Sequence, residues 1–103
     1  MNYLFLDNGF EEIEAITTID LLRRANIALT TVSVTGNPMV LGAHNIAVEA
    51  DGLLDKIDLS DAEMLILPGG QTKLGEYSAL CDLLVEHNKA DKLIAAICHC
   101  SCG

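Results

Sequence analysis

The sequence has few basic residues. Six Lys and Arg residues stand against fifteen Asp and Glu residues, which gives the 103-residue chain a formal net charge of −9. Such a surface repels phosphate backbones and anionic lipid headgroups, so neither a nucleic acid nor a membrane is expected as a partner. The sequence also has no basic leader, and its first apolar run is too short for a signal peptide or a bilayer span. We therefore expect a cytoplasmic protein.

Aromatic residues are also scarce, at four, but half of the residues are apolar. This length and composition predict a single compact domain over residues 1–103 and argue against disorder. Three of the four cysteines, Cys98, Cys100 and Cys102, lie within the last six residues, and the fourth is Cys81. Cysteines placed in this way cannot connect distant segments, so they are interpreted as thiols in a reducing compartment.

Strand-like and helix-like segments alternate along the chain. Apolar or β-branched runs predict strands, and longer segments with a helical repeat predict helices. In the first helix, Ile13, Ile16, Ile19 and Leu22 suggest an apolar stripe. The predicted strands are residues 3–6, 27–34, 64–67 and 93–97, the helices are about 11–25 and 78–89, a small hairpin joins 39–41 to 45–50, and 51–61 is an irregular connection. This order predicts an α/β fold with a mostly parallel sheet and helices on both faces.

Sites in such sheets form in the loops that leave the carboxyl ends of the strands. Here these loops are residues 7–12, residues 68–72, and the segment from Cys98 onwards. The first loop contains Asp7, Glu11 and Glu12 and a single glycine, which is the wrong composition for binding a phosphate. A nucleotide or flavin cofactor is therefore not expected, and no other cofactor is assigned.

Two side chains in these regions could carry chemistry. Cys98 follows a buried strand, where a sharp turn would project a nucleophile into the crevice and a following helix start would lower a thiol pKa. A buried cysteine that only fills space is the alternative, and the spacing alone favours it. Glu14 borders the apolar stripe and could donate a hydrogen bond to a thiolate, although a solvated first-turn glutamate fits the pattern too. Glu11 and Glu12 are expected to be solvated.

The sequence leaves the role of two further features undecided. Gly69 and Gly70 permit a turn with outward N–H groups, as in an oxyanion hole, but any tight turn would use them equally well. The tail from Cys98 to Cys102, with His99, offers soft metal ligands. Because common structural zinc knuckles space their cysteines by two residues and this tail spaces them by one, no metal site is assigned.

Taken together, these motifs resemble the DJ-one/ThiJ/PfpI superfamily, and its DJ-one/YajL branch more than its protease-like branch. The resemblance runs from residue 1 to Cys98. The motifs that carry it are DNGFEEIEA (7–15), DLLRRA (20–25), TVSV (31–34), GAH (42–44), AD (50–51), LILPGG (65–70) and LIAAIC (93–98).

The resemblance implies a flavodoxin-like fold and a homodimer. It implies that Cys98 is the reactive nucleophile, that Glu14 is its acidic partner, and that the backbone N–H groups of Gly70, beside Gly69, and of His99 form the oxyanion site. The implied activity is glyoxalase-type or deglycase-type chemistry on small reactive carbonyl compounds, in preference to peptidase-like or amidotransferase-like chemistry. The alternative is a non-enzymatic oxidative-stress sensor or chaperone that uses the same cysteine.

The chain departs from the family pattern after Cys98. Family members continue with small residues, a proline and a helix, whereas this chain reads His99-Cys100-Ser101-Cys102-Gly103. We interpret this ending as a truncation, a frameshift or an incomplete record. We also expect an open sheet edge at residues 93–97 and weak or no catalysis from these residues alone. An inactive remnant, which would express insolubly and unfold without cooperativity, is a further reading.

Overall fold

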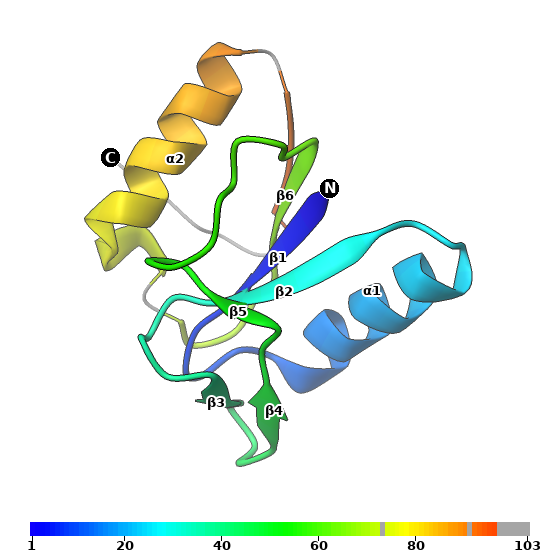
Figure 1. Cartoon of the computed structure of the whole chain (residues 1–103). Coiled ribbons are helices and arrows are strands. Elements are labelled where there is room, and N and C mark those ends of the chain that lie inside the picture. Colours follow the sequence, from blue (N-terminus) through cyan, green and yellow to red (C-terminus); the bar gives the residue numbers. More distant parts are fainter. Residues whose placement is uncertain (73, 91, 97–103) are drawn as a thin grey trace.

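The computed structural model describes residues 1–72, 74–90 and 92–96 (Figure 1). Five parallel strands form the main sheet, in the order β5-β2-β1-β6-β7, and a separate antiparallel hairpin pairs β3 with β4. The elements are β1 (Asn2–Leu6), α1 (Glu12–Arg24), β2 (Leu29–Ser33), β3 (Met39–Leu41), β4 (Ala47–Glu49), β5 (Gly52–Leu53), β6 (Met64–Leu67), η1 (Leu74–Glu76), α2 (Ser78–Lys89) and β7 (Leu93–Ala96). The predicted α/β fold is confirmed.

The central strand β1 shows why the sheet needs a helix on each face. Tyr3 and Phe5 belong to the core cluster that includes Leu80 and Leu84 of α2, whereas Leu4 and Leu6 belong to the cluster that includes Ala15 of α1. Successive side chains of a strand point to opposite faces, so a continuous apolar run requires cover on both. The two helices supply that cover from opposite sides of the sheet (Figure 1).

Helix α1 buries only part of the predicted stripe. Ile13 is 76% exposed and Ile16 is 42% exposed, while Ala15 is fully buried and Ile19 and Leu22 pack against the core. The reason is geometric: three residues advance about 300° around an α-helix, so a strict repeat of three drifts by about 60° at each step. Ile13 therefore lies about half a turn away from Leu22, on the opposite side of the helix. No described helix is long and apolar enough to cross a bilayer.

The segment predicted as an irregular connection contains a strand. Gly52 and Leu53 form β5, which pairs with Val32 and Ser33 at one edge of the sheet. A two-residue strand is too short to show an alternating pattern in the sequence, so β5 is recognised only from its pairing with β2 in the structure. At the other edge lies β7, where Leu93 is 69% exposed. Within the described residues this edge is open, as expected; Ile97, the last residue of the predicted strand, lies outside them.

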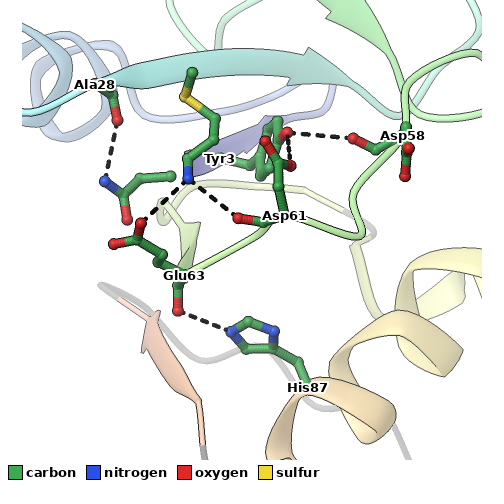
Figure 2. Close-up of polar contacts among 8 residues, drawn as sticks. Tyr3, Ala28, Asp58, Asp61, Glu63 and His87 are labelled. Atoms are coloured by element: carbon green, nitrogen blue, oxygen red, sulfur yellow. Dashed lines mark hydrogen bonds and ion pairs between the residues drawn. The ribbon is translucent and has the colours of Figure 1, made fainter.

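A polar network lies at the amino ends of the strands (Figure 2). The Tyr3 hydroxyl donates to Asp61 Oδ1 at 2.5 Å and to the Asp58 carbonyl at 3.2 Å, and burial, reinforced by Asp61, raises the pKa of Tyr3 to about 12. Buried His87 of α2 donates from Nε2 to the carbonyls of Glu63 and Leu93, at 3.2 and 3.0 Å. Since a carbonyl oxygen can only accept, Nε2 carries the proton. These bonds connect α2 to the starts of β6 and β7.

The buried stripe of α1 can be tested with one residue type placed at two positions. Ala15→Leu should lower the free energy of unfolding by about 1–3 kcal/mol, because it adds volume to a filled core. Thr17→Leu, at an exposed position of the same helix, should change it by less than about 0.5 kcal/mol. Urea unfolding followed by circular dichroism measures both. Equal effects would contradict the assignment of the buried face.

Candidate functional site

The loops that follow β1 and β6 contact each other through their backbones. Phe10 and Gly70 form an isolated antiparallel bridge. On either side of it, the Glu11 N–H donates to the Gly69 carbonyl and the Gln71 N–H donates to the Gly9 carbonyl, both at 2.8 Å. From β1 the chain proceeds to β2 on one side and later to β6 on the other, so the junction lies where the strand order reverses. This is the usual position of ligand sites in open α/β sheets.

Two glycines allow this close approach. Gly9 has φ +91° and Gly70 has φ +128°, a region that other residues rarely adopt. A Cβ at Gly9 would lie 2.6 Å from the Gln71 carbonyl oxygen, and a Cβ at Gly70 would overlap the Gly9 carbonyl and the Glu11 nitrogen. The loop junction therefore requires glycine at both positions.

The predicted site residue Glu14 reaches this junction. It is half-buried in the first turns of α1, and its Oε2 accepts a hydrogen bond from the Gly69 N–H at 3.1 Å. The structure thus brings Glu14 and Gly69, with the adjacent Gly70, to one place. The other two predicted site residues, Cys98 and His99, lie outside the described residues. The described part of β7 ends at Ala96, which pairs with Leu67 of β6.

The expectation that Glu12 is solvated is wrong. Its side chain is buried and accepts hydrogen bonds from the His44 N–H at 2.7 Å, the Ile46 N–H at 3.4 Å and the His44 ring Nδ1 at 2.8 Å. These donors lie on the turn of the β3–β4 hairpin, which closes over the start of α1. The carboxyl group occupies the space beside Gly42, where any Cβ would overlap it. The residue is acidic and in a first helical turn, so nothing local in the sequence signalled this burial.

The contact between Glu12 and His44 shifts the pKa values of both groups. Burial alone would raise the pKa of Glu12, but hydrogen bonds from the His44 ring and from backbone N–H groups outweigh it and hold the pKa at about 2. The hydrogen bond to Glu12, and the charges of Glu12 and Glu11, raise the pKa of His44 above 6.5. The Glu12 carboxylate is therefore ionised in the folded protein, and each group favours the charged form of the other.

Glu11 is held differently, as the N-cap of α1. Its Oε1 accepts the Ile13 N–H at 2.8 Å. Oxygen and nitrogen atoms of Glu11, Glu12 and His44 lie within 4.8 Å of one another, a spacing that a metal ion could bridge. Both carboxylate oxygens of Glu12 and Oε1 of Glu11 already accept hydrogen bonds, so we assign a structural role to this cluster. The cluster escaped sequence reasoning because His44 is 32 residues from Glu12.

Asp7 is a second buried carboxylate at the carboxyl end of β1. Its Oδ1 accepts the Tyr77 hydroxyl at 3.0 Å and the Asn8 N–H at 2.8 Å. Burial, followed by the hydrogen bond and charge of Asp7, raises the pKa of Tyr77. Tyr77 lies 70 residues from Asp7 in the sequence, so this pair too appears only in the folded structure. It fixes the Tyr77 side chain, next to the start of α2.

The contact between Glu12 and His44 predicts two limbs in the pH dependence of stability. The contribution of Glu12 is fully present above its ordinary pKa of 4.5 and is lost as the pH falls toward about 2. The contribution of protonated His44 is fully present below its ordinary pKa of 6.5 and is lost as the pH rises through the raised value. Glu12→Gln should therefore flatten both limbs of the unfolding free energy measured by urea denaturation across this range.

His44→Asn separates the two limbs. It removes the titrating ring but keeps the backbone N–H groups that bind Glu12, so only the alkaline limb should disappear. The acidic limb should persist, with a smaller amplitude. A Glu12→Gln curve parallel to that of the wild type would contradict a stabilising role for this pair.

The architecture and the site define a class of protein. A parallel sheet covered on both faces, with a glycine-dependent loop junction at the reversal of strand order, is characteristic of doubly wound α/β proteins with a site at the carboxyl ends of the strands. Residues 2–102 match the family model described as DJ-1/PfpI family. The chain therefore belongs to the DJ-1/PfpI family.

The chain is similar to curated proteins that are longer than itself. It is 34% identical over 98 residues to Protein dj-1beta of Drosophila melanogaster, an alignment that covers 92% of this chain and 52% of the relative. It is 31% identical over 99 residues to the Parkinson disease protein 7 homolog of Danio rerio, again covering 92% and 52%. The chain spans about half the length of these relatives.

Solved structures agree with this fold. The crystal structure of Drosophila melanogaster DJ-1beta matches with a TM-score of 0.88 at 33% identity, covering 95% of this chain and 56% of that one. Toxoplasma gondii DJ-1 matches with a TM-score of 0.87 at 32% identity, covering 93% and 54%. Both cover nearly the whole of this chain, so the described elements correspond to about half of each solved fold.

Proposed function

We propose that this chain carries part of a cysteine-dependent site for small reactive carbonyl compounds, with glyoxalase-type or deglycase-type chemistry. Cys98 is the proposed nucleophile and Glu14 the proposed acid–base partner. The observation that carries the proposal is the Glu14 carboxylate, fixed by Gly69 at the loop junction. The strand that precedes Cys98 in the sequence, β7, is the direct neighbour of the strand that leads to Gly69. Membership of the DJ-1/PfpI family supports the same assignment.

The position of Glu14 suggests how it would act. Because Oε2 accepts a hydrogen bond from the Gly69 N–H, we assign proton transfer to the other carboxylate oxygen, Oε1. In the proposed reaction the Cys98 thiolate adds to the aldehyde carbon of methylglyoxal, and Glu14 moves the proton of that carbon to the ketone carbon, which leaves a thioester. Water then cleaves the thioester, which releases lactate and restores the thiol. Methylglyoxal and water together give lactate, because the aldehyde carbon is oxidised while the ketone carbon is reduced. The chemistry needs no external redox partner, which agrees with the expectation that no cofactor is used.

A non-enzymatic role for the same cysteine is the second candidate. The similar structure from Toxoplasma gondii is described as oxidized, which applies to that protein and favours testing oxidation here. In this reading Cys98 is an oxidative-stress sensor, or part of a chaperone, and its oxidation changes the state of the protein. Catalysis and sensing differ in what Glu14 must do: catalysis requires it to transfer a proton, whereas sensing does not.

Lactate formation from methylglyoxal tests the catalytic proposal. Cys98→Ser should abolish it, and Glu14→Gln should lower the rate by about 10²–10⁴-fold, which is the usual contribution of a general acid–base group. Cys81→Ser, at the other cysteine placed well away from the chain end, should leave the rate unchanged. An enzymatic assay of lactate in all four proteins provides the measurement.

Equal lactate from all four proteins would contradict the assignment of both residues. Treatment with dilute peroxide then tests the second candidate, the oxidative-stress sensor. Mass spectrometry measures how fast each cysteine is oxidised. Absence of lactate together with oxidation of Cys98 ahead of Cys81 would favour the sensor. Oxidation at equal rates would argue against any special reactivity of Cys98.

We also propose that the protein forms a homodimer through α1 and the β3–β4 hairpin. The hairpin is attached to the start of α1 by the contact between Glu12 and His44. Apolar side chains are exposed on both elements: Ile13 (76%), Ile16 (42%), Met39 (47%), Leu41 (45%) and Ile46 (51%). Exposed apolar groups that gather in one region are typical of protein interfaces. Nucleic acid and membrane partners remain disfavoured by the charge of −9.

Analytical ultracentrifugation tests the dimer. The wild-type chain should sediment as a dimer, and the double variant Ile13→Glu, Ile16→Glu should sediment as a monomer, because it places charges in an apolar interface. Val85→Glu is the matched control, since Val85 is similarly exposed, at 45%, but lies on α2. A monomeric wild type, or a dimer unaffected by the double variant, would contradict this interface.

A further inference from the structure

A pocket of about 510 Å³ lies beside the carboxyl end of β2. Three segments enclose it: the end of β2 with the turn that follows, Leu54 and Asp55 after β5, and the start of α2 from Glu76 onwards. It shares no lining residue with the loop junction of Gly9, Phe10 and Gly70. The loop junction therefore does not account for this pocket.

The inner wall of the pocket contains apolar side chains and one aromatic ring, together with the buried polar residue Ser33. Val34 is buried, Leu54 is half-buried, and the half-buried Tyr77 also lines the pocket. The hydroxyl of Tyr77 is anchored to Asp7 at 3.0 Å, so the position of its ring does not depend on a ligand. A preorganised wall of this kind lowers the entropy that binding would cost.

The outer part of the pocket is negatively charged. Asp55 and Glu76 are exposed there, and in the part of the chain that the structure describes neither carboxylate makes a hydrogen bond or a salt bridge. The lining contains no lysine or arginine. A ligand would therefore meet two available carboxylates with no neighbouring cation among the lining residues.

We propose that this pocket binds a small organic cation, namely a primary amine carried on an aromatic or apolar body. The carboxylates of Asp55 and Glu76 would pair with the ammonium group, and the apolar body would lie on Val34 and Leu54. The ring of Tyr77 offers a second attraction, because an ammonium group over an aromatic face is stabilised. An anionic ligand would be repelled by the same carboxylates, and a neutral one would gain nothing from them.

Three probes of matched size test the proposal on the full chain: phenethylamine, phenethyl alcohol and phenylacetate. Heteronuclear NMR titration should shift the backbone amides of Gly36, Ser78 and Ala79, which line the pocket. The amine should bind about tenfold more tightly than the alcohol, since tenfold corresponds to one charge-assisted contact of about 1.4 kcal/mol. Phenylacetate should not bind. Added salt should weaken the binding of the amine but not that of the alcohol.

The double variant Asp55→Asn, Glu76→Gln should lower the affinity for the amine to that of the alcohol. Glu49→Gln is the matched control, because Glu49 is an exposed carboxylate on β4, outside the pocket lining. An alcohol that binds as tightly as the amine would overturn the proposal, as would an unaffected double variant or amide shifts away from the pocket. None of these outcomes depends on Cys98 or Glu14, so the result is independent of the proposed reaction.

Discussion

The backbone contact between the loops after β1 and β6 is the constraint on which the candidate site depends. The bridge between Phe10 and Gly70 forms because Gly9 and Gly70 present no side chain at the crossing. Glu11 then donates its N–H to the second loop while its side chain caps α1, so the same residue fixes both the crossing and the start of the helix. The position of Glu14, one turn further on, follows from that geometry.

A chain with a net charge of −9 must also stabilise the carboxylates that it buries. Asp7 and Glu12 are both buried, and each is satisfied by donors from a distant segment: Tyr77 in the first case and His44 in the second. These contacts attach α2 and the hairpin to the loop after β1. Charges that would otherwise cost stability thus hold the surroundings of the site together.

Much of the fold could be predicted from the sequence because its strands are continuous apolar runs. The strand at residues 64–67 and the helix at 78–89 were predicted with the bounds that the structure has. The predicted apolar stripe of α1 was confirmed at Ile19 and Leu22 but wrong at Ile13 and Ile16, because a repeat of three is not the period of a helix. Glu14, a site residue predicted from the sequence, lies at the loop junction, whereas the burial of Glu12 was missed because its partner His44 is 32 residues away.

The sequence by itself determined the class of fold, because the order of apolar runs and helical segments leaves few ways to cover a sheet on both faces. It also determined where the loops that could carry chemistry lie. Tertiary structure alone decided which carboxylate is buried, which reaches Gly69, and which, like Asp55 beside the pocket, makes no hydrogen bond or salt bridge within the described residues. The physical reason is that hydrogen bonds and charge contacts depend on distances in space, and local sequence patterns record only distances along the chain.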